Sequence, residues 1–139
     1  MIQNYLIFTV KDKRYALPSD IISEVAVLEK AFPLPLAPDY VRGIINRYSV
    51  PYALIDISCL FFKEESKARK VIVLKEEVDK IALLIDDVSD IAGLSPENLM
   101  KTEQAQEDSI SSFFEWKGSQ VFCLDAAELI NRIQKDFAN

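Results

Sequence analysis

Three carboxylates beside predicted strands are the side chains of this sequence best suited to chemistry. Asp56 and the pair Asp86 and Asp87 could act as general acids and bases or hold a metal ion. The sequence contains no histidine, however, and histidine is the commonest general base and metal ligand. Carboxylates that lack a histidine or a second acidic cluster more often serve in turns and helix caps. We therefore expect no catalytic residue, and the sequence disfavours an enzyme.

The cysteines and glycines offer no ligand site either. Cys59 and Cys123 lie in separate apolar runs, which predicts buried thiols in a reducing cytoplasm. A disulfide between them is the less favoured alternative. A zinc site would have to combine these distant cysteines with carboxylates, which is an unusual ligand set. Gly43, Gly93 and Gly118 belong to no phosphate-binding motif, so we expect neither a metal nor a cofactor.

Charge and hydropathy limit the classes of partner. The 139-residue chain has a net charge of −6 and an isoelectric point near 4.7. Nucleic acids and anionic membranes are recognised by basic patches, so this balance argues against both. Half of the residues are hydrophobic, enough for the interior of one domain or two small subdomains. The start MIQNYLIFTV has no basic segment and is much shorter than the about 20 apolar residues that span a bilayer. We expect a cytoplasmic protein without membrane insertion.

Short strands with polar turns dominate the predicted secondary structure. Aromatic and β-branched runs separated by short polar stretches predict three hairpins. Their strands are Tyr5–Val10 with Arg14–Leu17, Val71–Leu74 with Ile81–Ile85, and Phe113–Trp116 with Gln120–Leu124. The first hairpin has an expected three-residue loop, Lys11–Lys13, and Pro18 ends its second strand. This pattern is typical of β-barrels and β-sandwiches.

A further strand is predicted over Ser23–Leu28 from its alternation. Val25 and Val27 alternate with Glu24 and Ala26, which is the period of a half-buried strand. We expect Val25 to be buried and Glu24 to face the solvent on the opposite side.

Other segments predict irregular chain and helical turns. Three prolines within residues 33–38 exclude a regular helix or a central strand, so this segment must be extended. Residues 39–42 could form one helical turn closed by Gly43. Near the C-terminus, Asp125 begins an acidic form of the capping box, and apolar residues at helical spacing follow it. We expect a C-terminal helix over residues 126–137.

Six segments in a natural order resemble the CheW family of chemotaxis adaptors, and they extend over roughly Tyr5–Ile130. None is specific alone, but their order and spacing make the resemblance strong. The segments are Tyr5–Phe8 with Arg14–Pro18, Ile21–Val25, Phe32–Pro38 with Tyr40–Asn46, Leu54–Ile57, Leu84–Ile91, and Leu124–Ile130.

The resemblance implies an all-β fold made of two SH3-like five-stranded β-barrel subdomains, with short helices and a C-terminal helix. The whole chain, 1–139, would be a single CheW-like domain. We expect the first subdomain mostly at about 14–66. The second would lie mostly at about 67–125, with part of the N-terminal strand.

The resemblance also implies a function. A CheW-like adaptor couples chemoreceptors to the histidine kinase CheA in signalling arrays. A hydrophobic cleft between the barrels would take the helical hairpin tip of a receptor, and barrel edges would pair with the kinase regulatory domain. One alternative is an adaptor of another chemosensory pathway, for pilus or gliding motility, with altered partner choice. A small-ligand-binding β-barrel is a less favoured third reading.

Nine contact residues follow from the resemblance, although each apolar one could simply be part of the core. Those expected to bind the kinase are Ile22, Glu24, Val25, Gly43 and Tyr48. Those expected to bind the receptor are Ile44, Asn46, Val88 and Ile91.

The sequence departs from the family pattern at one turn. Arg47-Tyr48-Ser49 stands where the family usually has Leu-Arg-Gly, so Tyr48 holds the position of an exposed arginine and Ser49 that of a turn glycine. Arg47, one residue earlier, would point to the opposite face of a strand. A proline is displaced to Pro51, and Ser112 replaces a further glycine. We expect these changes to keep the fold and to alter one kinase contact.

Overall fold

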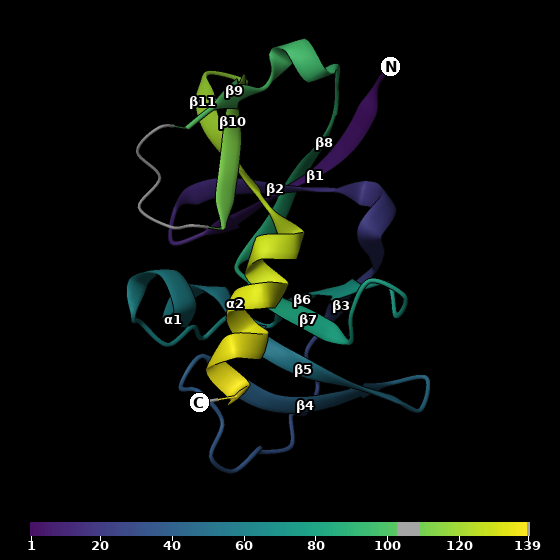
Figure 1. Ribbon diagram of the computed structural model, residues 1–139, viewed down its shortest axis with the longest axis vertical. Helices are drawn as coiled ribbons and strands as arrows, with labels where there is room; N and C mark the ends of the chain where they lie inside the picture. The colour runs from purple at the N-terminus through teal and green to yellow at the C-terminus, as the bar shows by residue number, and fades with distance from the viewer. Residues whose placement is uncertain (103–108, 139) are drawn as a thin grey trace. The chain divides into compact units, whose positions relative to one another are not determined.

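The computed structural model describes residues 1–102 and 109–138, and these residues form two β-sheets with short helices (Figure 1). The first sheet has five strands in the order β3-β6-β7-β5-β4. Its strands are β3 (Ile22–Val27), β4 (Val41–Arg47), β5 (Val50–Asp56), β6 (Lys70–Leu74) and β7 (Ile81–Ile85).

The second sheet has six strands in the order β8-β1-β2-β11-β10-β9. Its strands are β1 (Gln3–Val10), β2 (Lys13–Pro18), β8 (Asp87–Leu94), β9 (Met100–Lys101), β10 (Ile110–Trp116) and β11 (Ser119–Leu124). The mainly β prediction is therefore confirmed, but this sheet has one strand more than expected. The additional strand is the two-residue β9, which pairs with β10 through Met100 and Lys101.

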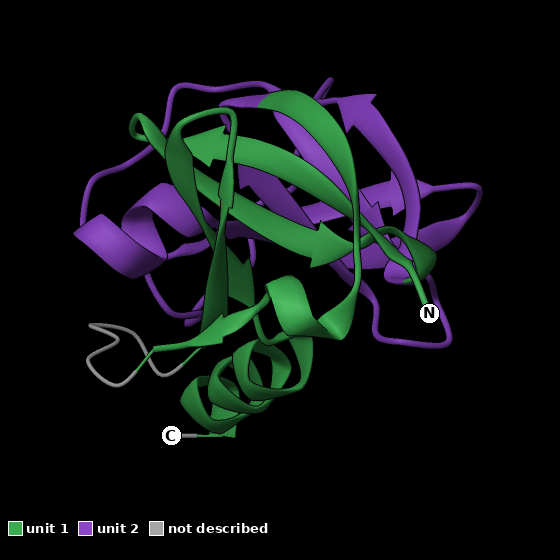
Figure 2. Ribbon diagram, turned by 90° about the horizontal axis from the view of Figure 1, so that it is seen from above, with its two compact units in different colours: residues 1–20, 88–139 green, residues 21–87 purple. Residues whose placement is uncertain are grey.

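The chain divides into two compact units, coloured separately in Figure 2. Unit 2 is Ile21–Asp87, and unit 1 combines Met1–Asp20 with Val88–Asn139. These boundaries differ from the expected ranges of about 14–66 and 67–125. The difference arises because β6 pairs with β3, and β7 pairs in parallel with β5, so both strands belong to unit 2. Parallel pairing joins strands that are distant in sequence, and a local pattern cannot show it.

Each unit has its own apolar core. Leu54 and Val71 are fully buried in unit 2, and Ile7 and Phe114 are fully buried in unit 1. Burying a side chain of this size stabilises a fold by about 1.5–3 kcal/mol. The predicted hairpins therefore form because their branched and aromatic residues fill these two interiors.

Hairpin turns correct one prediction. The first hairpin has a two-residue turn, Lys11 and Asp12, instead of the expected three-residue loop, because Lys13 already pairs with Val10. Both turn residues have positive φ, 51° and 64°. Two-residue turns of this kind match the right-handed twist of the strands and need positive φ at both positions. Pro18 ends β2 as predicted.

Helices occupy the ends of strands. The six-residue helix α1 (Ile57–Phe62) begins after Asp56, whose side chain accepts a hydrogen bond from the Cys59 amide. The C-terminal helix α2 (Ala126–Ala138) is confirmed, and Asp125 Oδ1 accepts from the amide of Glu128 at 3.2 Å. Two 3₁₀ turns, Ser19–Ile21 and Pro96–Asn98, connect strands. The caps made by Asp56 and Asp125 satisfy amide groups that the first turn of each helix leaves unpaired.

Candidate functional site

Strand β3 turns its charged face inward and its apolar face outward. Val25 is 42% exposed and Val27 is 58% exposed, whereas the side chain of Glu24 is only 25% exposed. The expectation of a buried Val25 opposite a solvent-facing Glu24 is therefore wrong. Alternation was predicted correctly, but the assignment of its two faces was reversed.

An ion pair explains this reversal. The Nε and Nη2 atoms of Arg47 donate to Glu24 Oε1 at 2.7 and 2.6 Å. Glu24 lies on β3 and Arg47 on β4, which are the two outer strands of the five-stranded sheet. The sheet therefore curls until its outer strands meet, and a charged pair joins them. Glu24 faces inward because its partner lies across this opening.

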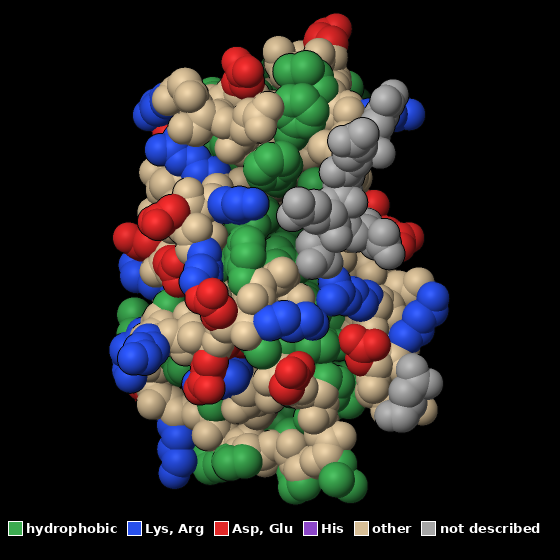
Figure 3. All heavy atoms as spheres, turned by 90° about the vertical axis from the view of Figure 1, so that its left-hand side faces the viewer, with side chains coloured by type: hydrophobic (Ala, Val, Ile, Leu, Met, Phe, Trp, Pro, Cys, Tyr) green, Lys and Arg blue, Asp and Glu red, His purple; other side chains and the backbone are tan. Residues whose placement is uncertain are grey.

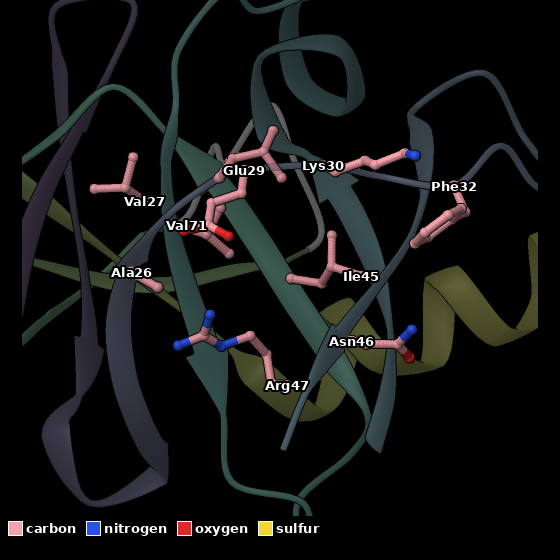
Figure 4. Close-up of a pocket in the computed structure, with 10 residues that line it drawn as sticks. Ala26, Val27, Glu29, Lys30, Phe32, Ile45, Asn46, Arg47 and Val71 are labelled. Carbon is pink, nitrogen blue, oxygen red and sulfur yellow. The ribbon is translucent and has the colours of Figure 1, made fainter. Parts of the chain in front are cut away.

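We call this opening the β3–β4 seam: residues 24–27 of β3 facing residues 45–47 of β4. A pocket of about 190 Å³ lies along it. Figure 4 shows Arg47 extending from its strand toward β3, with Ile45 and Val71 on the pocket floor. Phe32, which is 47% exposed, lies at the other end, and its amide and carbonyl both pair with Ile44. The seam is thus closed by backbone pairing at one end and by the ion pair at the other.

Gly43 has a steric role at this closure. Its φ is +132°, and a Cβ atom built on it would lie 2.3 Å from the carbonyl oxygen of Phe32. Only glycine fits such an approach. The possible helical turn over residues 39–42 is shorter than expected: the Val41 amide donates to the Pro38 carbonyl at 3.0 Å, but β4 already begins at Val41 and Gly43 lies at a register shift opposite Leu54. Gly43 is buried, and its partner contact stays a prediction.

Tyr48 and Ser49 form the two-residue turn between β4 and β5. Their φ values are 53° and 66°, and the side chain of Tyr48 is 85% exposed. The guanidinium of Arg47 lies 5.6 Å from the centre of the Tyr48 ring. Arg47 and Tyr48 therefore have different tasks: the first holds the seam, and the second is presented at the turn.

The predicted kinase contacts all belong to unit 2, whereas the predicted receptor contacts are divided between units. Ile22, Glu24 and Val25 share β3, and Ile22 is half-buried. Ile44, half-buried, and Asn46, exposed, lie on β4. The remaining receptor candidates lie on β8 of unit 1, where Val88 is half-buried and Ile91 is 61% exposed.

Of the three carboxylates that could have done chemistry, Asp56 serves the structure. Asp56 is fully buried and accepts hydrogen bonds from Arg42 Nη1 at 3.0 Å and from the Ser66 amide at 2.8 Å, in addition to capping α1. Asp86 and Asp87 are exposed. Within residues 1–102 and 109–138, no group of three or more Cys, Asp or Glu side chains could hold a metal ion.

The thiols show the opposite of nucleophilic activation. Burial raises the pKa of the Cys59 thiol, and the nearby carboxylates of Asp39 and Asp56 raise it further. Burial also raises the pKa of Cys123, although a hydrogen bond with Ser112 lowers it in part. A reactive cysteine requires a lowered pKa, so these thiols behave as packing groups.

Unit 1 has a second charged closure, which we call the β8–β10 seam. Asp90 on β8 accepts from the indole Nε1 of Trp116 on β10 and from the ammonium group of Lys117, both at 2.8 Å. These bonds lower the pKa of Asp90 to about 2, with Lys117 the largest cause and Trp116 the next. On the face shown in Figure 3, basic and acidic side chains are interspersed.

Sequence reasoning missed Val27, Phe32 and the role of Arg47. Arg47 stands next to a predicted turn, and its partner Glu24 lies on a strand that is not its neighbour in the sheet. Only the curling of the sheet brings them together. Val27 shares a face with Val25, since residues two apart on a strand lie on one side, so the wrong assignment of Val25 carried Val27 with it.

Comparisons with known proteins agree on one family. Residues 4–134 match the model of the CheW-like domain. The chemotaxis protein CheW of Rhizobium meliloti (strain 1021) is 29% identical over 109 residues, which cover 76% of this chain and 70% of that protein. The chemotaxis protein CheW of Klebsiella aerogenes is 25% identical over 100 residues, which cover 70% of this chain and 60% of that protein.

The same fold occurs in a solved structure. The scaffolding protein TtCheW from Thermoanaerobacter tengcongensis superimposes with a TM-score of 0.80 over 89% of this chain and 84% of the other, at 16% identity. Within the part of the chain that the structure describes, no helix is long and apolar enough to cross a membrane.

Proposed function

The chain belongs to the CheW-like domain family, and we propose that it is a non-enzymatic adaptor that couples a chemoreceptor to the histidine kinase CheA in a cytoplasmic signalling array. The relatives named above are chemotaxis proteins, and one solved relative is a scaffolding protein. In this role the protein changes no bond. It holds its partners so that a receptor signal reaches the kinase as a shift between conformational populations.

The observation that carries the proposal is the exposed apolar row on β3. Val25 and Val27 leave hydrophobic surface open on a strand whose charged residue is already paired within the unit. Protein-docking surfaces have this character, with an apolar centre and few free charges. The kinase contact would centre on this row, with the half-buried Ile22 at the start of the same strand and Tyr48 at the β4–β5 turn.

Receptor binding is proposed for the remaining candidates. Asn46 on β4 and Ile91 on β8 are exposed, and Ile44 and Val88 are half-buried. An exposed isoleucine such as Ile91 suits an apolar contact with the helical tip of a receptor. The absence of an activated thiol and the structural use of Asp56 support a binding role over catalysis.

Reconstitution tests the adaptor role. CheA and receptor-containing vesicles would be mixed with and without this protein, and kinase autophosphorylation and co-sedimentation would be measured. We expect receptor-dependent stimulation of the kinase only when the protein is present. A protein that co-sediments with neither partner and leaves the kinase unchanged would overturn the proposal.

The Tyr48-Ser49 turn favours a second candidate, an adaptor of another chemosensory pathway such as pilus or gliding motility. A tyrosine in place of arginine keeps contact area but loses charge-assisted hydrogen bonds. Under this alternative, Tyr48→Arg strengthens binding to a CheA that pairs with conventional adaptors. An unchanged affinity in the Tyr48→Arg variant would remove the support for a different pathway.

A further inference from the structure

The turn that carries Tyr48 is unlike the other two-residue turns of the chain. In unit 1 the equivalent turns are Lys11-Asp12 and Lys117-Gly118, which have a polar residue followed by aspartate or glycine. An aromatic residue with positive φ costs about 1 kcal/mol or more, because its Cβ crowds the backbone. The ring of Tyr48 is nevertheless presented to solvent at 85% exposure.

Beside this turn lies an open pocket of about 350 Å³. Its polar lining includes Tyr52 of β5 and Glu76 and Glu77 of the β6–β7 loop. Tyr52 as a residue is only 6% exposed, and its hydroxyl makes no hydrogen bond within residues 1–102 and 109–138. Ser109 Oγ is the one side-chain polar atom in this part of the chain that is buried without a partner, so the Tyr52 hydroxyl reaches solvent from the pocket wall and is available to a ligand.

Charge at the pocket is negative. Arg47 is also in the lining, but its charge is matched by Glu24. Glu76 and Glu77 are exposed, take part in no ion pair within the described chain, and outnumber Lys75. Tyr52 reports the same field, because its pKa is raised first by burial and then by the carboxylates of Glu76, Glu24 and Glu77.

We propose that this pocket binds an arginine side chain of the partner protein. A guanidinium group is planar and carries five donors. It can stack on the open face of Tyr48, donate to the Tyr52 hydroxyl and pair with the carboxylates of Glu76 and Glu77. The family pattern has an arginine of the adaptor at the position of Tyr48. Here the roles are exchanged: this chain supplies the aromatic and acidic groups, and the partner supplies the cation. The identity of that partner rests on the proposed adaptor function.

The pocket can be tested without the partner. The ¹⁵N-labelled full chain would be titrated with N-acetylarginine amide and, as a neutral isostere, with N-acetylcitrulline amide, and amide shifts followed by NMR. We expect saturable shifts at residues 48, 52, 76 and 77 with the arginine compound alone. Tyr52→Phe and the double variant E76Q/E77Q should weaken these shifts. Equal shifts with both compounds, or none, would overturn the proposal.

Binding to the CheA regulatory domain then separates the two proposals. We expect the E76Q/E77Q variant to bind this domain about tenfold more weakly than the wild type does. Its affinity should also depend less on the salt concentration. The matched control E97Q/E115Q removes the same charge from unit 1 and should bind as the wild type does. If the wild type does not bind the kinase domain, the adaptor proposal fails while the titration still decides the pocket. If it binds and E76Q/E77Q changes nothing, the pocket proposal fails while the adaptor proposal stands.

Discussion

The two seams close their sheets with similar chemistry but leave different surfaces. At the β8–β10 seam, Asp90 receives an indole and an ammonium donor, and Trp116 also packs on the unit 1 core. At the β3–β4 seam, one ion pair spans the opening, and a pocket and two exposed valines remain beside it. The β8–β10 seam therefore serves the stability of unit 1. The β3–β4 seam leaves apolar surface that a partner can cover.

The largest effect is expected at the glycines of the two units. Gly43→Ala places a Cβ against the backbone of Phe32 at positive φ, so we expect a loss of about 3 kcal/mol or more in the free energy of unfolding. Gly118→Ala also has positive φ but meets open space, so its cost should be about 1–2 kcal/mol. Urea unfolding measures both. Equal costs would show that the backbone at Phe32 can move away from a side chain at residue 43.

A double-mutant cycle measures how firmly the β3–β4 seam is held. The side chains of Glu24 and Arg47 are 25% and 30% exposed, so solvent screens the pair in part. We expect a coupling of about 1 kcal/mol between Glu24→Ala and Arg47→Ala. The more exposed pair Lys70–Asp87 serves as the control, and its coupling free energy should be only about 0.3 kcal/mol. A coupling near zero at the seam would mean that the outer strands are held by packing alone.

Replacing Ser49 by glycine sharpens the comparison of turns. Ser49 has a φ of 66°, which glycine adopts without strain, so Ser49→Gly should stabilise the protein by about 0.5–1 kcal/mol. Gly118→Ser in unit 1 is the reciprocal change and should destabilise by a similar amount. Thermal or urea unfolding gives both values. If Ser49→Gly is destabilising instead, the side chain of Ser49 contributes more to stability than its strained backbone costs.

The smallest effect is a change in pH dependence at the β8–β10 seam. The pKa of Asp90 is lowered from 3.8 to about 2, so its contribution is fully present above pH 4 and is lost as pH falls through 2. Asp90→Asn should therefore reduce stability near neutral pH and have little effect at pH 2. An NMR titration of Asp90 checks the pKa directly. Trp116→Phe removes one donor and should raise it, and an unchanged pKa would contradict the assignment.

Local patterns in the sequence predicted elements better than their pairing. The hairpin strands, the strand containing Val25 and the C-terminal helix follow from periodicity and turn chemistry, because these are local properties. The parallel pairing of β5 with β7 and the approach of Glu24 to Arg47 are not local, and the boundaries of the units and the faces of β3 depend on them. The replacement of the usual arginine by Tyr48 was visible in the sequence. The pocket beside Tyr48 was not, because the β6–β7 loop, which is distant in sequence, forms part of its lining.

We propose that Val25 and Val27, the exposed row on β3, bind the kinase. Isothermal titration of the CheA regulatory domain against Val25→Glu tests it, with circular dichroism to confirm folding. The matched control is Ile91→Glu, which introduces the same charge at an exposed apolar residue of unit 1. The account predicts that Val25→Glu abolishes measurable kinase binding while Ile91→Glu retains it. Wild-type affinity in the folded Val25→Glu variant would contradict the claim.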